Sequence, residues 1–150
     1  MFPSNPYIPY KLKQIDLSYN FIPVITYDLT FGTSKLEKLN MSHNAIADVR
    51  KGVIGNLTSA KLLDLSYNKL HDLTSDPDFF RLPPNISSLL LAGNELTELP
   101  WPHLKNVSHL KLVDLKDNLL DQIAQNASDL IMSGTEIAYE ESFSNEDRNK

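Results

Sequence analysis

The stretch Ala60–Leu70, AKLLDLSYNKL, recurs with variation five times in this chain of 150 residues. The other copies read LKQIDLSYNFI from Leu12, LEKLNMSHNAI from Leu36, ISSLLLAGNEL from Ile86 and LKLVDLKDNLL from Leu110. Each copy carries one asparagine at the same place, and these are Asn20, Asn44, Asn68, Asn94 and Asn118. They are separated by 24, 24, 26 and 24 residues. A fixed period in this range is typical of a solenoid, which predicts a scaffold for binding.

Apolar residues alternate with other residues at the fourth and sixth positions of every copy, which indicates strands with one buried face. The predicted core positions are Ile15, Leu17, Leu39, Met41, Leu63, Leu65, Leu89, Leu91, Val113 and Leu115. Strands in successive coils would then lie parallel, about 4.8 Å apart. Each asparagine would stand where the chain leaves its strand, where an amide can satisfy backbone groups that the bend leaves unpaired.

The pattern LxxLxLxxNxL, repeated in phase over roughly residues 11 to 131, is identified as that of the leucine-rich repeat family. The resemblance implies an α/β solenoid shaped as a horseshoe of about five coils. Its parallel β-sheet would line the concave face, and short helical or irregular returns the convex face. Around a repeat domain at 11–133 we expect a proline-rich extended lead-in at 1–10 and a polar, acidic, flexible tail at 134–150. The alternative for the tail is one strand, with Ile137, Tyr139 and Phe143, that covers the last coil.

Composition and motifs argue against several other classes of protein. The chain has no cysteine and a net charge of −5, so no disulfide, thiolate site or basic nucleic-acid surface is expected. It lacks the common phosphate, nucleophile and zinc motifs and any 18-residue apolar stretch. We therefore expect no enzyme activity, cofactor, metal, small-molecule substrate or membrane span. Exported family members commonly carry disulfide-bonded caps, and their absence here predicts a fragment or incomplete chain.

Residues that alternate with the core positions would line the concave face, and we expect a protein partner to bind there. An apolar contact of three leucines is predicted beside a polar, acidic stripe, with two tyrosines and a histidine along one rim. These candidate partner-binding residues are Tyr19, His43, Leu62, Asp64, Tyr67, Leu90, Leu112 and Asp114. The alternative is a solvated sheet that tolerates a few leucines.

Asn-x-Ser/Thr sequons occur five times, more than chance pairing of these residue types predicts. Four fall in predicted return segments and are the candidate glycosylation sites: Asn56, Asn85, Asn106 and Asn126. The fifth, Asn40, projects from a strand and is the least expected to be used. The sequons favour an extracellular or cell-surface recognition or adhesion module resembling receptor and matrix ectodomains. The missing cysteines and leader favour the alternative, a cytoplasmic scaffold or regulatory subunit.

Overall fold

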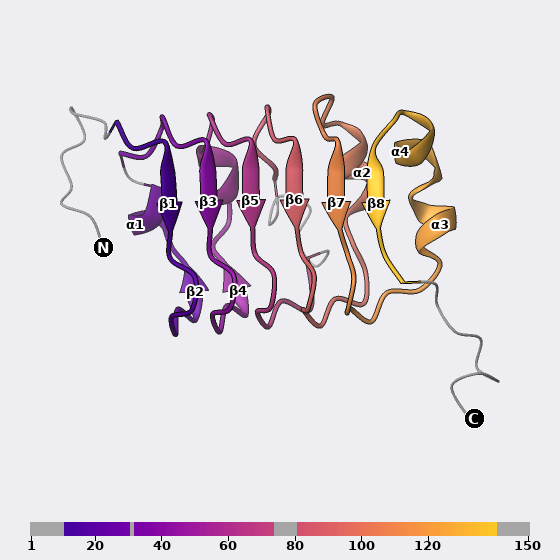
Figure 1. Ribbon diagram of the computed structural model, residues 1–150, viewed down its shortest axis with the longest axis horizontal. Helices are drawn as coiled ribbons and strands as arrows, with labels where there is room; N and C mark the ends of the chain where they lie inside the picture. The colour runs from indigo at the N-terminus through magenta and orange to yellow at the C-terminus, as the bar shows by residue number, and fades with distance from the viewer. Residues whose placement is uncertain (1–10, 31, 74–80, 141–150) are drawn as a thin grey trace.

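A computed structural model of the protein describes residues 11–30, 32–73 and 81–140. Its main feature is a parallel sheet whose six strands follow one another in chain order (Figure 1). The strands are β1 (Gln14–Asp16), β3 (Lys38–Asn40), β5 (Leu62–Asp64), β6 (Ser88–Leu90), β7 (Leu112–Asp114) and β8 (Glu136–Ala138). The expected parallel sheet, with one strand for each copy of the repeat, is confirmed.

Equivalent positions of the repeats lie in register across the sheet. Ile15 pairs with Leu39, Leu39 with Leu63, and Leu63 with Leu89 although that step is 26 residues long. The two additional residues of the third coil are therefore taken up outside the strands. Register holds because a shift by one residue would exchange the buried and exposed faces of a strand.

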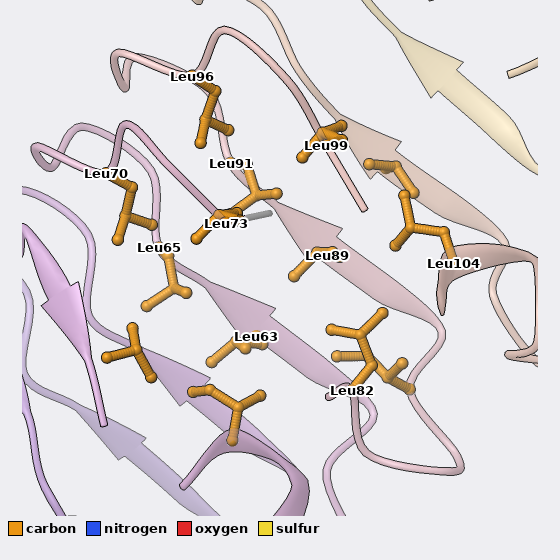
Figure 2. Packing of buried hydrophobic residues seen from close by; sticks show 14 of the residues in the cluster. Leu63, Leu65, Leu70, Leu73, Leu82, Leu89, Leu91, Leu96, Leu99 and Leu104 are labelled. Atoms are coloured by element: carbon orange, nitrogen blue, oxygen red, sulfur yellow. The ribbon is translucent and has the colours of Figure 1, made fainter. Parts of the chain in front are cut away.

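The core lies behind the sheet and consists of the predicted apolar positions together with side chains of the returns. Eight of the ten predicted strand residues are buried, whereas Ile15 and Leu17 of the first coil are half-buried and pack against the core. The third and fourth coils place buried leucines at equivalent positions (Figure 2). In the third coil these are Leu63, Leu65, Leu70 and Leu73, and in the fourth they are Leu89, Leu91, Leu96 and Leu99. Ile15 and Leu17 are less covered because, among the described residues, β1 is the first strand of the stack.

The return segments are short, as expected. The first two coils contribute the parallel pair β2 (Val24–Ile25) and β4 (Asp48–Val49), and α1 (Tyr27–Thr30) and the 3₁₀ helix η1 (Ile54–Asn56) follow them. The fourth coil has α2 (Trp101–Lys105), and the last has α3 (Ile123–Asn126) and α4 (Ser128–Met132). The return of the third coil runs through 74–80, outside the described residues, as do the lead-in at 1–10 and the tail end at 141–150.

The repeated asparagines join one coil to the previous one. The Asn68 side chain donates to the carbonyl oxygens of Met41, Leu65 and Ser66 at 3.0, 3.1 and 3.2 Å. Its Oδ1 accepts the backbone N–H of Ile46 at 3.0 Å. Asn44, Asn94 and Asn118 repeat this arrangement. Each amide thus satisfies backbone groups of two coils that the bend would otherwise leave unpaired.

The sheet continues past residue 133, where the sequence pattern placed the end of the repeat domain. Strand β8 lies in the segment 134–150, and Ile137 pairs with Val113 in register. Ile137 and Tyr139 are partly buried against the core. Residues 134–140 therefore belong to the stack, because they cover the apolar edge that the fifth coil would otherwise expose.

Candidate functional site

The open face of the main sheet, opposite the core, brings five of the predicted partner-binding residues together. In register, Ser88 lies between Leu62 and Leu112, and Leu90 lies between Asp64 and Asp114. We name these five the open-face patch: Leu62, Asp64, Leu90, Leu112 and Asp114. All five side chains are half-buried. With strands about 4.8 Å apart, one small protein group can touch all three leucines.

The open-face patch combines an apolar centre with fixed negative charge. Leu90 has an aspartate on each side, and the side chains flanking it further along its own strand are the small Ser88 and the buried Ala92. Lys116 reaches Asp114 at only 4.0 Å, and both groups are partly exposed, so this pair neutralises little charge. The patch therefore suits a partner that presents an apolar side chain next to positive charge.

The three carboxylates of the stripe also close the turns after β1, β5 and β7. Asp64 Oδ1 accepts the backbone N–H of Ser66 at 2.9 Å, and Asp114 Oδ1 accepts that of Lys116 at 3.2 Å. In the first coil Asp16 accepts both the backbone N–H and the hydroxyl of Ser18, at 2.9 and 2.6 Å. These two hydrogen bonds lower the pKa of Asp16 below its usual value, and the bond from the Ser18 hydroxyl contributes more than the bond from the backbone N–H. The sequence analysis missed this role, which the spacing Asp/Asn-x-Ser could have indicated.

Tyr19, His43 and Tyr67 form a separate group at the carboxyl ends of the strands, which we call the aromatic ladder. The ring centroids of Tyr19 and His43 are 4.2 Å apart, and those of His43 and Tyr67 are 4.7 Å apart, with nearly parallel planes. All three residues have positive φ, between 55° and 58°. This backbone conformation aims each ring along the solenoid, so the rings of successive coils stack. The predicted rim residues thus meet one another.

The four candidate glycosylation sites Asn56, Asn85, Asn106 and Asn126 are all exposed. Asn40 differs, because it is half-buried and its Oδ1 accepts the backbone N–H and the hydroxyl of Ser42 at 3.0 and 2.7 Å. Its side chain therefore serves the turn in the way that Asp16 and Asp64 do. This geometry separates one sequon from the other four.

A basic edge escaped the sequence analysis, which expected none. Five lysines stand at the amino ends of the first three strands, namely Lys11, Lys13, Lys35, Lys38 and Lys61. A net charge of −5 for the whole chain hides this local excess. The sequence could have indicated this edge, because the repeat register places the one to three residues that precede each strand next to one another, and several of these residues are lysines.

The described residues contain neither a cluster suited to a metal ion nor a helix suited to a membrane. Within 11–30, 32–73 and 81–140, no three or more histidine or acidic side chains are grouped so that they could hold a metal ion. No helix in these same ranges combines the length and the apolar character needed to cross a membrane.

Fold and open face together define a solenoid of leucine-rich repeats, and sequence comparison agrees. Osteomodulin from Rattus norvegicus is 31% identical over 117 residues, which cover 77% of this chain and 26% of osteomodulin. The leucine-rich repeat-containing G-protein coupled receptor 5 of the same species is 32% identical over 102 residues, or 68% of this chain and 11% of the receptor. No protein-family model matches the chain.

Comparison with solved structures supports the same fold. A leucine-rich repeat protein of Leptospira interrogans superposes with a TM-score of 0.67 at 24% identity, covering 83% of this chain and 30% of that protein. The chain belongs to the leucine-rich repeat proteins. It spans about a quarter of the length of osteomodulin and about a tenth of that of the receptor.

Proposed function

We propose that the chain is a protein-binding module of an extracellular matrix or cell-surface protein, and that its partner docks on the open-face patch. The observation that carries the proposal is the arrangement of three half-buried leucines around Ser88, with an aspartate on each side of Leu90. The fold does not require leucine at these positions, since other strands place Gln14, Lys38 and Asn40 there. Apolar side chains gathered on an open sheet are typical of interaction sites.

The partner would place an apolar side chain among the leucines and a basic group near Asp64 or Asp114. Burying such an anchor supplies most of the affinity, while the charges select the partner and fix its orientation. The aromatic ladder would extend this contact toward the carboxyl ends of the strands. Tyr19 and Tyr67 are 75% and 47% exposed, so both rings keep area for a partner to cover.

Two further points support an extracellular setting. Osteomodulin is a secreted matrix protein, and the similarity to it covers 77% of this chain. The four candidate glycosylation sites are exposed and belong to return segments or to loops that precede a strand. Glycans there would leave the open-face patch accessible.

Binding is tested with an array of secreted and cell-surface ectodomains, followed by surface plasmon resonance on each ectodomain that binds. In the triple variant L62S/L90S/L112S we expect affinity to fall at least about 30-fold, as loss of an interface hot spot does. The matched control L119S/I131S/M132S removes three exposed apolar side chains elsewhere and should bind as the unmodified chain does. Equal affinities for the unmodified chain and the triple variant, with folding intact, would contradict the proposal.

The extracellular setting is tested by intact mass before and after enzymatic removal of N-linked glycans, on protein from its native source. We expect a mass loss that maps to one or more of Asn56, Asn85, Asn106 and Asn126. A chain without glycans at all four positions would favour the cytoplasmic scaffold instead.

A further inference from the structure

The amino-end edge of the main sheet carries five lysines over the first three coils. Lys13 and Lys61 directly precede β1 and β5, and Lys38 is the first residue of β3. Lys11 and Lys35 occupy the same position in adjacent coils. The backbones touch along this edge, since Glu37 N–H donates to Lys13 O and Lys61 N–H to Glu37 O, both at 2.8 Å.

Most of this charge is uncompensated. All five lysines are exposed, and Glu37 is the one acidic residue at the described edge positions 11–14, 35–38 and 59–62. It pairs with Lys61 at 3.5 Å. No carboxylate in the described part of the chain lies within ion-pair distance of Lys11, Lys13, Lys35 or Lys38. Four positive charges thus remain on the first two coils, whose strands are about 4.8 Å apart.

These charges oppose folding instead of supporting it. Like charges on neighbouring strands repel, and at about 5 Å in water each pair costs up to roughly 1 kcal/mol before screening by salt. The lysine side chains are exposed and supply no core packing in return. An anionic ligand bound at this edge would be attracted to the lysines and would offset the repulsion between them.

The opposite edge, where the strands end, has more acidic than basic residues. The acidic residues after the strands are Asp48, Asp72, Glu95, Glu98, Asp117 and Asp121, and the basic residues are Arg50, Lys69 and Lys116. In Figure 1 the two edges correspond to the two ends of the strand arrows. A long anion would therefore be attracted to the amino-end edge and repelled from the carboxyl-end edge.

We propose that Lys11, Lys13, Lys35 and Lys38 form a binding site for a linear sulfated polysaccharide. The site crosses two adjacent coils, so its charges can meet neighbouring sulfates of a linear anion, and lysine ammonium groups can pair with sulfates as point charges. Single-stranded nucleic acid fits less well, because the described edge positions hold no aromatic side chain on which a base could stack. This site adjoins the open-face patch, since Lys38 pairs in register with Leu62, but it does not depend on the proposed protein partner.

The test is isothermal titration of the folded chain with a heparin octasaccharide at low and near-physiological salt. We expect binding that weakens with salt and that is about 10- to 100-fold weaker in K11Q/K13Q/K35Q, as loss of three exposed charge pairs predicts. The matched control K69Q/K105Q/K116Q removes the same charge elsewhere and should keep the affinity. The variant L62S/L90S/L112S should also bind heparin normally, which separates this site from the open-face patch.

Three outcomes would overturn the assignment. The first is absence of heparin binding, and the second is equal affinity of the unmodified chain and K11Q/K13Q/K35Q. The third is binding of a single-stranded RNA of the same charge as tightly as heparin, which would make the edge a nucleic-acid site. Thermal unfolding of K11Q/K13Q/K35Q provides the folding control, and its midpoint should be unchanged or raised because repulsion is removed.

Discussion

The ring of Tyr67 occupies the space that a side chain at Gly93 would need. A Cβ built on Gly93 would lie 2.3 Å from the Cδ1 atom and 2.9 Å from the Cγ atom of Tyr67. Gly93 follows Tyr19, His43 and Tyr67 at the same position of the next coil, and its φ is +68°. The aromatic ladder therefore ends in a ring that lies against bare backbone.

Replacing Gly93 by alanine should destabilise the protein by about 2 to 4 kcal/mol. Positive φ accounts for roughly 1 to 2 kcal/mol, and displacement of the Tyr67 ring from His43 adds the rest. Gly52→Ala is the matched control, since its φ is +78° but nothing lies within 4 Å of the added Cβ. Urea unfolding measures both, and Tyr67→Ala combined with Gly93→Ala should recover the part due to the clash. Equal losses in the two glycine variants would show that Tyr67 does not restrict position 93.

The asparagines that link the coils should matter unequally. In Asn68→Ala, the buried backbone N–H of Ile46 loses its acceptor. The carbonyl oxygens of Met41, Leu65 and Ser66 each lose one of two donors. We expect a total cost of about 2 to 3 kcal/mol. Asn20 is exposed and its amide donates within its own coil, to Leu17 O and Ser18 O, so Asn20→Ala should cost less than about 1 kcal/mol. Denaturant midpoints of the two variants give the comparison. Similar losses at both positions would argue against coil-to-coil bonding as the source of the effect.

The sequence predicted the parts of this structure that depend on periodicity. Leu62, Leu90 and Leu112 were placed on the open face because residues alternate in a strand, and register then brings them together. The stacking of Tyr19 on His43 depends on the positive φ of both residues, which a strand pattern does not contain. Residues 134–140 were placed in the tail because they lack the leucines and the asparagine, although Ile137 follows Val113 by the same 24 residues and was a candidate for a covering strand. The basic edge was missed because whole-chain charge averages over two edges of opposite sign.

Titration should detect the hydrogen bond between Ser18 and Asp16. The Ser18 hydroxyl stabilises the carboxylate and lowers the pKa of Asp16, so Ser18→Ala should raise that pKa toward the usual value of 3.8. The backbone N–H of residue 18 still donates in this variant, which makes the return incomplete. Carboxyl-carbon NMR shifts followed over acidic pH give the value. A carboxyl group with a lowered pKa contributes stability above its unfolded pKa, and that contribution is lost as the pH falls through the folded pKa. An unchanged pKa in Ser18→Ala would remove the hydroxyl as its cause.

Glu140 should show the opposite behaviour. A hydrogen bond between the two carboxyl groups, followed by charge repulsion from Asp117, raises the pKa of Glu140 above 4.5, while Lys116 acts weakly against this shift. The sign follows from linkage, because the folded state then holds the proton of Glu140 more tightly than the unfolded state does. The resulting stabilisation is fully present below the unfolded pKa and is lost as the pH rises through the folded pKa.

Asp117→Asn tests this pair, because it removes the repulsion and should lower the pKa of Glu140. NMR titration of the Glu140 carboxyl carbon gives the shift directly, and Asp121→Asn, a nearby exposed acid, is the charge-matched control. The unmodified chain should gain stability relative to Asp117→Asn as the pH falls toward 4.5. An equal pKa of Glu140 in the unmodified chain and in Asp117→Asn would show that the Glu140 carboxyl group does not lie close to Asp117, in the turn after β7.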